Sequence, residues 1–392
     1  MTPAARVQSS IEILDLIVLA AKAQAAPADR ILADWFRAHR FAGSKDRRAI
    51  RELVYRAIRA CGPIPDSGRA AILRLAEEDD ALIPLFDGSH YGPRTTDAAD
   101  KAAAAGVAPN WLVERLAASE IAGPEATALL DRAPLDLRVN TLKAQRDGLA
   151  LPEDATSTDA SNGLRLAPGT PVEQWDAYRN GEIEIQDTGS QFACQAVLAQ
   201  PGETIVDLCA GAGGKTLALA AAMDNRGRLI ACDTDRSRLS RLAPRAERAG
   251  AEIIETRLLD PGKEEAALAD FIGQADAVLI DAPCSGTGTW RRKPEARWRL
   301  TDGSLAKLRV TQRELLALGA RLLKPGGRLI YVVCSLLDEE GADQFDRFLA
   351  DNPNFESQAL SLPLGAPRKR GIRLTPYRDG TDGFFIACAR QP

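Results

Sequence analysis

The sequence feature that most constrains the fold is a rhythm of strand, glycine turn and helix that begins after Gln191. Five apolar segments of strand length, separated by stretches of helix length, occupy residues 203–210, 227–233, 251–260, 275–284 and 326–335. Apolar strands alternating with helices are typical of a parallel sheet covered on both faces. We therefore predict an α/β domain over residues 192–392. Its ligand site should lie beyond the carboxyl ends of the strands, and each segment has Asp or Cys at or near that end.

The two regions before this domain have different patterns. Residues 1–130 show helical periodicity, with a capping-box pattern at Ser9 and Glu12 and further helices expected near Pro27 and after Ser44. Residues 131–191 contain short strand-like pieces and turns, which predict a small α+β module. We therefore expect an all-helical domain, a small α+β module and the α/β domain, in that order.

Composition excludes several classes of protein. The net charge is -4, so any contact with nucleic acid must come from local basic clusters. The seven cysteines form no Cys-x-x-Cys pair and the chain has only two histidines, which disfavours a disulfide framework and predicts no metal site. The segment 11–26 carries acidic residues, and no apolar run reaches membrane-spanning length. We expect a cytoplasmic, monomeric protein with no membrane contact.

A glycine-rich loop at residues 209–216 (CAGAGGKT) follows the first strand of the α/β domain and opens a helix. Its glycines allow the backbone to approach a ligand, and the helix N-terminus offers free N–H groups to anionic or polar atoms. A phosphate loop of an NTPase would need glycine where this chain has Cys209. The spacing of Gly211, Gly213 and Gly214 also differs from the G-x-G-x-x-G pattern of dinucleotide-binding folds.

Three aspartates stand near the ends of the next strands. Asp233 ends the second segment, where a carboxylate can accept hydrogen bonds from both hydroxyls of a ribose. Asp260 ends the third segment and is placed to meet an adenine edge, and Asp281 ends the fourth, close to where a transferred group would emerge. Their recurrence predicts a cofactor that contains a ribose.

Two cysteines follow neighbouring strands: Cys284 in DAPCSGTGTWRRKPE (281–295) and Cys334 in YVVCS (331–335). A single cysteine at a strand end is usually a small buried residue. Two of them at one edge of the sheet, next to Asp281, suggest catalysis.

With these motifs, DLCAGAGGKT (207–216) and DGFFIA (382–387), the C-terminal half resembles the RNA cytosine-5 methyltransferase family of the RsmB and Nop/Sun type. LRVNTLK (137–143) and IQDTGSQ (185–191) extend the resemblance upstream. Residues 43–59 are similar to the NusB-like helical domain of bacterial rRNA members, and the α+β module would then be RRM-like. The resemblance implies a Rossmann-like class I methyltransferase fold, S-adenosylmethionine as cofactor and RNA as partner, with 16S ribosomal RNA favoured and transfer RNA as the alternative.

The resemblance also implies roles for single residues. By this resemblance Cys334 is the nucleophile and Cys284 assists release of the product. Asp281 acts on the cytosine base. The cofactor-binding residues are Cys209, Ala210, Gly211, Ala212, Gly213, Gly214, Lys215, Asp233, Asp260 and Asp281. Ala212 departs from the family, which commonly has proline there, so we expect a change in loop stiffness with binding retained.

Cytosine chemistry explains this set of residues. Carbon 5 is too weak a nucleophile to attack a methyl sulfonium directly, so a thiolate first adds to carbon 6. The ring charge must then be neutralised at N3, a role for a carboxyl group with raised proton affinity such as Asp281. The proton on carbon 5 must leave before the thiolate is expelled, and Cys284 is the expected helper in that step.

Basic clusters predict the contacts with RNA. Basic residues alternate with Trp290 and Trp298 between residues 290 and 299, a mixture that suits phosphates and a stacked base. Two further clusters lie between Arg37 and Arg56 and between Arg368 and Arg378. The first contains seven basic residues and only two acidic ones. Each could instead be a solvated face. The predicted RNA-binding residues are Arg138, Asn140, Trp290, Arg291, Arg292, Lys293 and Arg297.

Two other functions remain open. A DNA cytosine methyltransferase would use the Pro-Cys thiol, Cys284, as its nucleophile, although the upstream regions favour RNA. A catalytically idle RNA-binding or ribosome assembly factor could keep the same fold, although the intact Cys334, Cys284 and Lys215 argue against it.

Overall fold

The computed structural model describes residues 1–391, which divide into two compact units. One unit comprises residues 1–131 and 289–301, and the other comprises residues 132–288 and, among those described, 302–391. Within the described residues, no helix combines the length and the apolar character needed to cross a bilayer.

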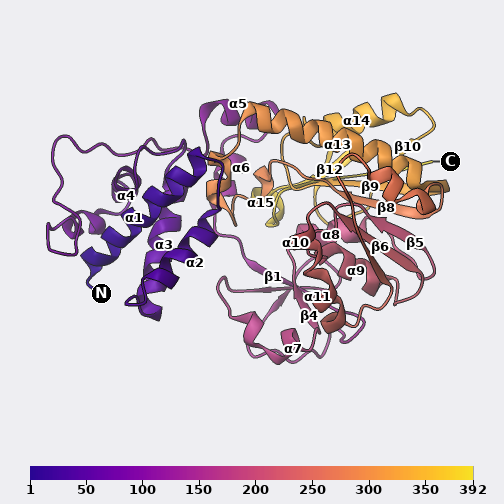
Figure 1. Cartoon of the computed structure of the whole chain (residues 1–392), viewed down its shortest axis with the longest axis horizontal. Helices are drawn as coiled ribbons and strands as arrows, with labels where there is room; N and C mark the ends of the chain where they lie inside the picture. Colours follow the sequence, from indigo (N-terminus) through magenta and orange to yellow (C-terminus); the bar gives the residue numbers. More distant parts are fainter. Residues whose placement is uncertain (392) are drawn as a thin grey trace. The chain divides into compact units, whose positions relative to one another are not determined.

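The first unit is helical (Figure 1). Its helices are α1 (Pro3–Lys22), α2 (Ala28–Ala38), α3 (Ser44–Ala60), α4 (Gly68–Ala76), α5 (Asn110–Ala118) and α6 (Pro124–Thr127), with 3-10 turns η1 (Asp80–Leu85), η2 (Ala128–Leu130) and η6 (Pro294–Trp298). Helices α2 and α3 begin as predicted, but the start predicted for α1 at Ser9 is wrong. Thr2 caps that helix instead, because its Oγ1 accepts a hydrogen bond from the backbone N–H of Ala5 at 3.1 Å.

The segment 289–301 belongs to the helical unit, although its sequence follows a strand of the α/β domain. Arg297 is fully buried and donates hydrogen bonds of 2.6 Å to the carbonyls of Ile58 and Cys61, at the end of α3. Trp298 packs in the helical core and donates from Nε1 to the Gly62 carbonyl at 3.1 Å. These bonds supply donors to carbonyls at and just after the end of α3, where helical N–H donors are lacking.

The second unit contains two sheets. The smaller, antiparallel sheet has the order β2-β3-β1-β4, from strands β1 (Leu135–Val139), β2 (Thr156–Ser157), β3 (Gly163–Leu166) and β4 (Ile183–Ile185). The larger sheet has nine strands, β5 (Thr204–Asp207), β6 (Arg228–Asp233), β7 (Ile254–Leu258), β8 (Ala275–Asp281), β9 (Leu323–Val333), β10 (Glu356–Gln358), β11 (Ala366–Arg368), β12 (Gly371–Leu374) and β13 (Phe384–Arg390).

The five predicted strands form the parallel part of the large sheet, in the order β9-β8-β5-β6-β7. This arrangement confirms the predicted Rossmann-like fold. Strand β13, which carries the DGFFIA motif, adds antiparallel to β9. The chain order reverses between β5 and β8, so the carboxyl ends of these two strands mark the switch point at which such sheets bind ligands.

Helices cover both faces of the large sheet (Figure 1). Alternate strand residues enter two cores. Ile205, Leu229 and Leu279 pack with α9 (Gly214–Ala222), whereas Val206, Ile230 and Ile280 pack with α13 (Asp302–Leu322) and α14 (Ala342–Asp351). The helices of this unit are α7 (Asp176–Arg179), α8 (Thr188–Gln195), α9 (Gly214–Ala222), α10 (Arg236–Leu239), α11 (Leu242–Ala249), α12 (Glu264–Ala267), α13 (Asp302–Leu322), α14 (Ala342–Asp351) and α15 (Pro376–Asp379), with 3-10 turns η3 (Val172–Gln174) and η4 (Ala269–Phe271).

The burial of Trp298 predicts that the segment 289–301 stabilises the helical unit. Trp298→Ala should lower the free energy of unfolding by about 3 to 5 kcal/mol, because it leaves a large cavity and removes the bond to Gly62. Urea denaturation followed by circular dichroism would measure the change. Trp111→Ala, at a half-buried tryptophan of the same unit, is the control and should cost less. Equal loss in both variants would contradict the structural role of Trp298.

Candidate active site

The two cysteines predicted for catalysis lie together at the carboxyl edge of the large sheet. Cys284 follows β8, Cys334 follows β9, and their sulfur atoms are 3.4 Å apart. The contact with Cys334 and burial both raise the pKa of Cys284 well above its ordinary value. Cys284 therefore remains a thiol at neutral pH and can donate or hold a proton next to Cys334.

A buried carboxylate, Glu340, fixes the loops that carry these cysteines. Its Oε1 accepts hydrogen bonds from the backbone N–H of Ser285 at 2.8 Å and from Gln312 at 3.1 Å. Its Oε2 accepts hydrogen bonds from the hydroxyls of Ser285 and Ser335, the latter at 2.6 Å. Since Ser285 and Ser335 directly follow Cys284 and Cys334, one side chain fixes the position of both thiols. Burial raises the pKa of Glu340, although these hydrogen bonds oppose the rise.

The glycine loop after β5 is held by Asp233, at the end of β6. Asp233 Oδ2 accepts a hydrogen bond from the Gly211 N–H at 2.8 Å, and its Oδ1 accepts one from Asp235 N–H at 2.7 Å. Gly213 has a φ of 85°, and a Cβ there would lie 2.0 Å from a Leu242 methyl carbon. Only glycine fits that position without displacing a neighbour.

Arg245 holds the backbone at Ala212, the position at which this sequence differs from the family pattern. The Ala212 carbonyl accepts a hydrogen bond of 2.7 Å from Arg245, whose second terminal nitrogen pairs with the buried Glu184 at 2.7 Å. This bond restrains the backbone at the position where the family commonly has proline.

Lys215 does not point into the same cavity as Asp233. Its Nζ lies 2.7 Å from Asp281 Oδ2 and 5.6 Å from the centroid of the Phe384 ring. Burial alone would lower the pKa of Lys215, but the nearby negative charges, that of Asp281 above all, and the hydrogen bond to Asp281 together raise it. The sequence predicted a carboxyl group of raised proton affinity at Asp281, whereas the structure places this carboxylate in an ion pair with Lys215.

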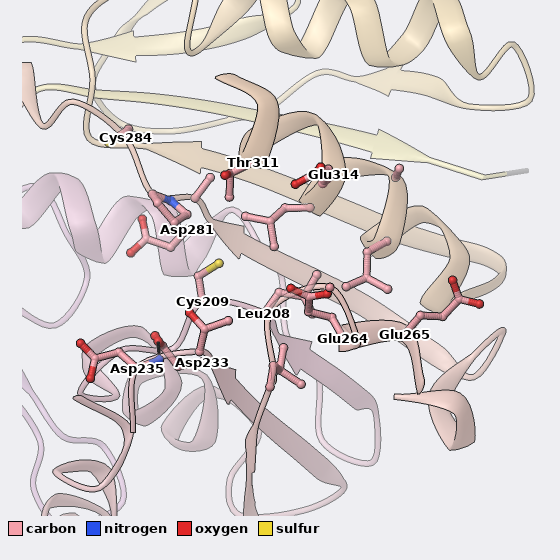
Figure 2. A pocket seen from close by; sticks show the side chains of 18 of the residues that line it. Leu208, Cys209, Asp233, Asp235, Glu264, Glu265, Asp281, Cys284, Thr311 and Glu314 are labelled. Atoms are coloured by element: carbon pink, nitrogen blue, oxygen red, sulfur yellow. Dashed lines mark hydrogen bonds between the residues drawn. The ribbon is translucent and has the colours of Figure 1, made fainter. Parts of the chain in front are cut away.

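Two cavities meet at the carboxyl edge of the sheet. The larger has a volume of about 680 Å³ and the smaller of about 310 Å³, and both are lined by Cys209, Arg238 and Asp281. Figure 2 shows Asp281 and Cys209 between Cys284 on one side and Asp233 and Asp235 on the other, with Thr311 and Glu314 on the neighbouring helix α13. The shared residues mean that a ligand in one cavity can be adjacent to a ligand in the other.

The predicted site residues are divided between these cavities. Cys209, Asp233, Asp281, Cys284 and Cys334 line the larger cavity, and Cys209, Ala210, Ala212, Gly214, Lys215 and Asp281 line the smaller one. Gly211, Gly213 and Asp260 line neither of these two cavities. Asp260 is exposed, and its neighbours Leu259 and Gly262 line the larger cavity instead.

The larger cavity suits a cofactor with a cationic group and a flat apolar ring. Leu208, Leu259 and Leu315 supply apolar walls. Its lining also includes six acidic residues against two basic ones: Asp233, Asp235, Glu264, Glu265, Asp281 and Glu314 against Arg238 and Arg321. A volume of about 680 Å³ is within the range for a small-molecule site. The residues present therefore fit S-adenosylmethionine, which combines an adenosine with a sulfonium and an amino-acid tail.

Most of the residues predicted to contact RNA are buried and have structural roles. Arg138 donates to Gln186 at 2.7 Å, and Asn140 donates to the carbonyls of Gly181 and Ala249 at 2.8 Å. Trp290 and Arg297 are fully buried, and Arg291 is 5% exposed. These side chains are buried within the protein, so their predicted contact with RNA stays a prediction. Arg292 and Lys293 are exposed.

Sequence reasoning missed Asp207 and Glu340. Asp207 ends β5 as a fully buried residue, and its Oδ2 accepts a hydrogen bond from Thr216 at 2.8 Å, which joins the strand to α9. Its position inside the DLCAGAGGKT motif was the available signal. Glu340 lies in the acidic run 338–340, and such a run is typical of an exposed loop. Only the folded structure shows that the loops after the two cysteines pack around it.

Comparison with known proteins identifies the family. A family model described as 16S rRNA methyltransferase RsmB/F matches residues 195–390, half of the chain. The chain belongs to the RsmB/F family. This membership supports the predicted cofactor, S-adenosylmethionine.

Relatives of the RsmB/F chain include the ribosomal RNA small subunit methyltransferase B of Klebsiella pneumoniae, 36% identical over 292 residues, or 71% of this chain and 65% of that protein. The probable methyltransferase B of Bacillus subtilis is 32% identical over 72% of this chain and 66% of its own length. The chain therefore spans about two thirds of the length of these curated relatives.

Among solved structures, a methyltransferase homologue protein from Pyrococcus horikoshii is 26% identical, with a TM-score of 0.60 over 72% of this chain and 99% of that one. The crystal structure of PH0851 is also 26% identical and has a TM-score of 0.75, covering 99% of both chains.

The environment of Asp207 predicts a pH dependence of stability. Burial raises its pKa to about 7, so the stability that the protonated carboxyl contributes is complete below the unfolded pKa of 3.8 and is lost as pH rises through 7. In Asp207→Asn, which can still accept the bond from Thr216, this loss should be absent. The difference in free energy of unfolding between variant and wild type should change by about 4 kcal/mol between pH 4 and pH 8.

Urea denaturation at a series of pH values would measure this difference. Asp147→Asn, at a side chain that is 98% exposed, is the matched control and should follow the wild-type curve. A constant difference between Asp207→Asn and wild type across this range would show that Asp207 does not titrate there.

Proposed function

We propose that this RsmB/F protein transfers a methyl group from S-adenosylmethionine to carbon 5 of a cytosine in RNA, through a covalent adduct with Cys334. The observation that carries the proposal is the pair of thiols, 3.4 Å apart, in the lining of a cavity that suits the cofactor. We propose 16S ribosomal RNA as the substrate and the cytoplasm as the location. A transfer RNA substrate and an idle assembly factor of the same fold are the alternatives.

In this proposal the cofactor occupies the larger cavity and supplies an electrophilic methyl group. Asp233 accepts hydrogen bonds from the ribose, while Leu208, Leu259 and Leu315 contact the adenine ring. The acidic lining favours a cofactor that carries positive charge on its sulfonium and amino groups.

The chain's own residues then handle the base. The Cys334 thiolate forms a bond to carbon 6, and the electron pair displaced from the ring is stabilised at N3 by a proton from the pair formed by Asp281 and Lys215. Carbon 5 becomes nucleophilic and takes the methyl group. A water molecule beside the Cys284 thiol then takes the proton from carbon 5, and the electron pair of that bond restores the double bond between carbons 5 and 6 as the bond between sulfur and carbon 6 breaks. The Cys334 thiolate is released, and N3 returns its proton to the pair formed by Asp281 and Lys215.

Cys284 acts in the last stage, when the proton leaves carbon 5 and the Cys334 thiolate is released. Its raised pKa keeps it a thiol, so it is a poor nucleophile but a suitable group for moving a proton near Cys334, directly or through water. A group that keeps its proton suits the helper role proposed for Cys284. In a DNA-type mechanism Cys284 would attack instead.

The roles proposed for the two cysteines predict that Cys334→Ala and Cys284→Ala fail at different steps of the reaction. Cys334→Ala should form neither methylated RNA nor a covalent adduct, because the attacking thiolate is absent. Cys284→Ala should allow attack and methyl transfer but impair elimination, so protein should accumulate attached to methylated RNA. A denaturing gel with labelled RNA and labelled cofactor distinguishes the two.

The double variant is the control, since the slow band of Cys284→Ala should vanish when Cys334 is also replaced. A band in Cys334→Ala that is absent from Cys284→Ala would reverse the roles. If wild type transfers no methyl group while it still binds RNA, the idle assembly factor becomes the better description.

The ribose assignment predicts weaker cofactor binding in Asp233→Ala. Loss of a hydrogen-bonded carboxylate should cost about 1.5 to 3 kcal/mol of binding free energy for S-adenosylmethionine. Titration calorimetry would measure it, with Glu252→Ala, an exposed acid outside the cavity, as control. Unchanged affinity in an Asp233→Ala protein that keeps its thermal stability would refute the assignment.

A further inference from the structure

A basic groove on the helical unit has no part in the site described above. Its lining residues come from α2, α3 and the segment between them: Ala33, Phe36, Arg37, Arg40, Arg47 and Arg51. The groove has a volume of about 620 Å³, and four of these six residues are arginines while none is acidic. We call it the arginine groove.

Most of the positive charge of the arginine groove is not neutralised by the protein. Arg37 pairs with Asp34 at 2.7 Å, but Arg40 and Arg51 form no ion pair with any residue between 1 and 391. Arg47 donates from Nε to the Ala42 carbonyl at 2.8 Å and from Nη2 to the Phe36 carbonyl at 3.4 Å, which uses its five donors only in part. Asp46, beside Arg47 in sequence, pairs with Arg6 at 2.8 Å. Three arginines therefore remain available to bind an anion.

The basic cluster between Arg368 and Arg378 differs in this respect. Arg368 pairs with Asp338, Lys369 pairs with Asp343, and Arg378 pairs with Asp379 at 2.9 Å. Folding therefore neutralises much of that cluster, whereas it leaves the arginine groove charged.

An aromatic surface adjoins the arginine groove at the end of α2. Phe41, next to Arg40, is 65% exposed. Its ring packs edge-on against Trp35 and His39, with centroids 6.3 Å and 5.7 Å apart. His39 in turn stacks on Trp35 at 4.0 Å, which makes a rigid support for the exposed ring. An exposed ring beside several arginines can stack a base while the cations bind the phosphates on either side.

We propose that the arginine groove and Phe41 bind single-stranded RNA, with Arg40, Arg47 and Arg51 on phosphates and Phe41 against a base. Single strands are favoured because a duplex keeps its bases stacked inside and would leave Phe41 without a partner. The inference deepens the proposed function, on which it rests, by assigning a second contact surface for the RNA substrate.

The test compares two double variants of the full chain that remove the same charge. Arg40→Gln with Arg51→Gln removes two cations of the groove. Lys22→Gln with Lys101→Gln removes two exposed cations of the same unit that lie outside it. Arg47 is left unchanged because it fixes the segment at Ala42. Affinity for a labelled single-stranded oligouridine is measured at several salt concentrations, with thermal unfolding as a check of folding.

The groove variant should bind at least tenfold more weakly than wild type at low salt. The slope of log affinity against log salt should fall in magnitude by about 1.4, or about 0.7 for each lost phosphate contact to a single strand. The lysine variant should keep the wild-type slope. Phe41→Ala should weaken binding by about tenfold with no change in slope, since stacking releases no counterions. Tyr91→Ala, at another exposed ring, should have no effect.

Three results would overturn the proposal. They are wild-type affinity and slope in the groove variant, equal losses in the groove and lysine variants, and a loss for duplex RNA or for polyglutamate that matches the loss for oligouridine. The last result would assign the groove to duplexes or to an acidic protein. The proposed function fails separately, if wild type transfers no methyl group to 16S rRNA, whatever the oligouridine affinities are.

Discussion

The buried carboxylate of Glu340 is the interaction on which the geometry of the active site depends. A carboxylate can be kept inside a protein only when hydrogen bonds replace its hydration. Here they come from Ser285, Ser335 and Gln312, on two loops and helix α13. The sheet brings the ends of β8 and β9 side by side, and Glu340 then fixes how the residues after them are directed. The contact of 3.4 Å between the thiols follows from both constraints.

Charge is distributed differently in the parts of the protein that would meet cofactor and RNA. The larger cavity is lined mainly by acids, which suits a cationic cofactor, whereas the arginine groove lies on the other unit and carries positive charge. A net charge of -4 conceals this separation. Local clusters therefore predict partners better than the total charge does, because screening in salt limits electrostatic interactions to short distances.

Basic residues in sequence do not by themselves form a basic surface. The segment 290–299 combines arginines with tryptophans, a composition typical of an RNA contact, yet Arg297 and Trp298 bind the carbonyls of Ile58 and Gly62. The same five donors that let a guanidinium bind phosphate also let it satisfy buried carbonyls at a helix end. Only the folded chain distinguishes these two uses, because the partners lie more than 230 residues apart in sequence.

The sequence by itself determined the parallel sheet, the glycine loop and the placement of Cys284, Cys334, Asp233 and Asp281 at one edge. Strand and turn patterns are local, and the carboxyl ends of parallel strands necessarily share an edge. Tertiary structure alone decided that the segment 289–301 packs with the helices, that Asp260 lies outside both cavities, and that Asp207 and Glu340 are buried. Each of these depends on contacts between residues distant in sequence, which local patterns do not encode.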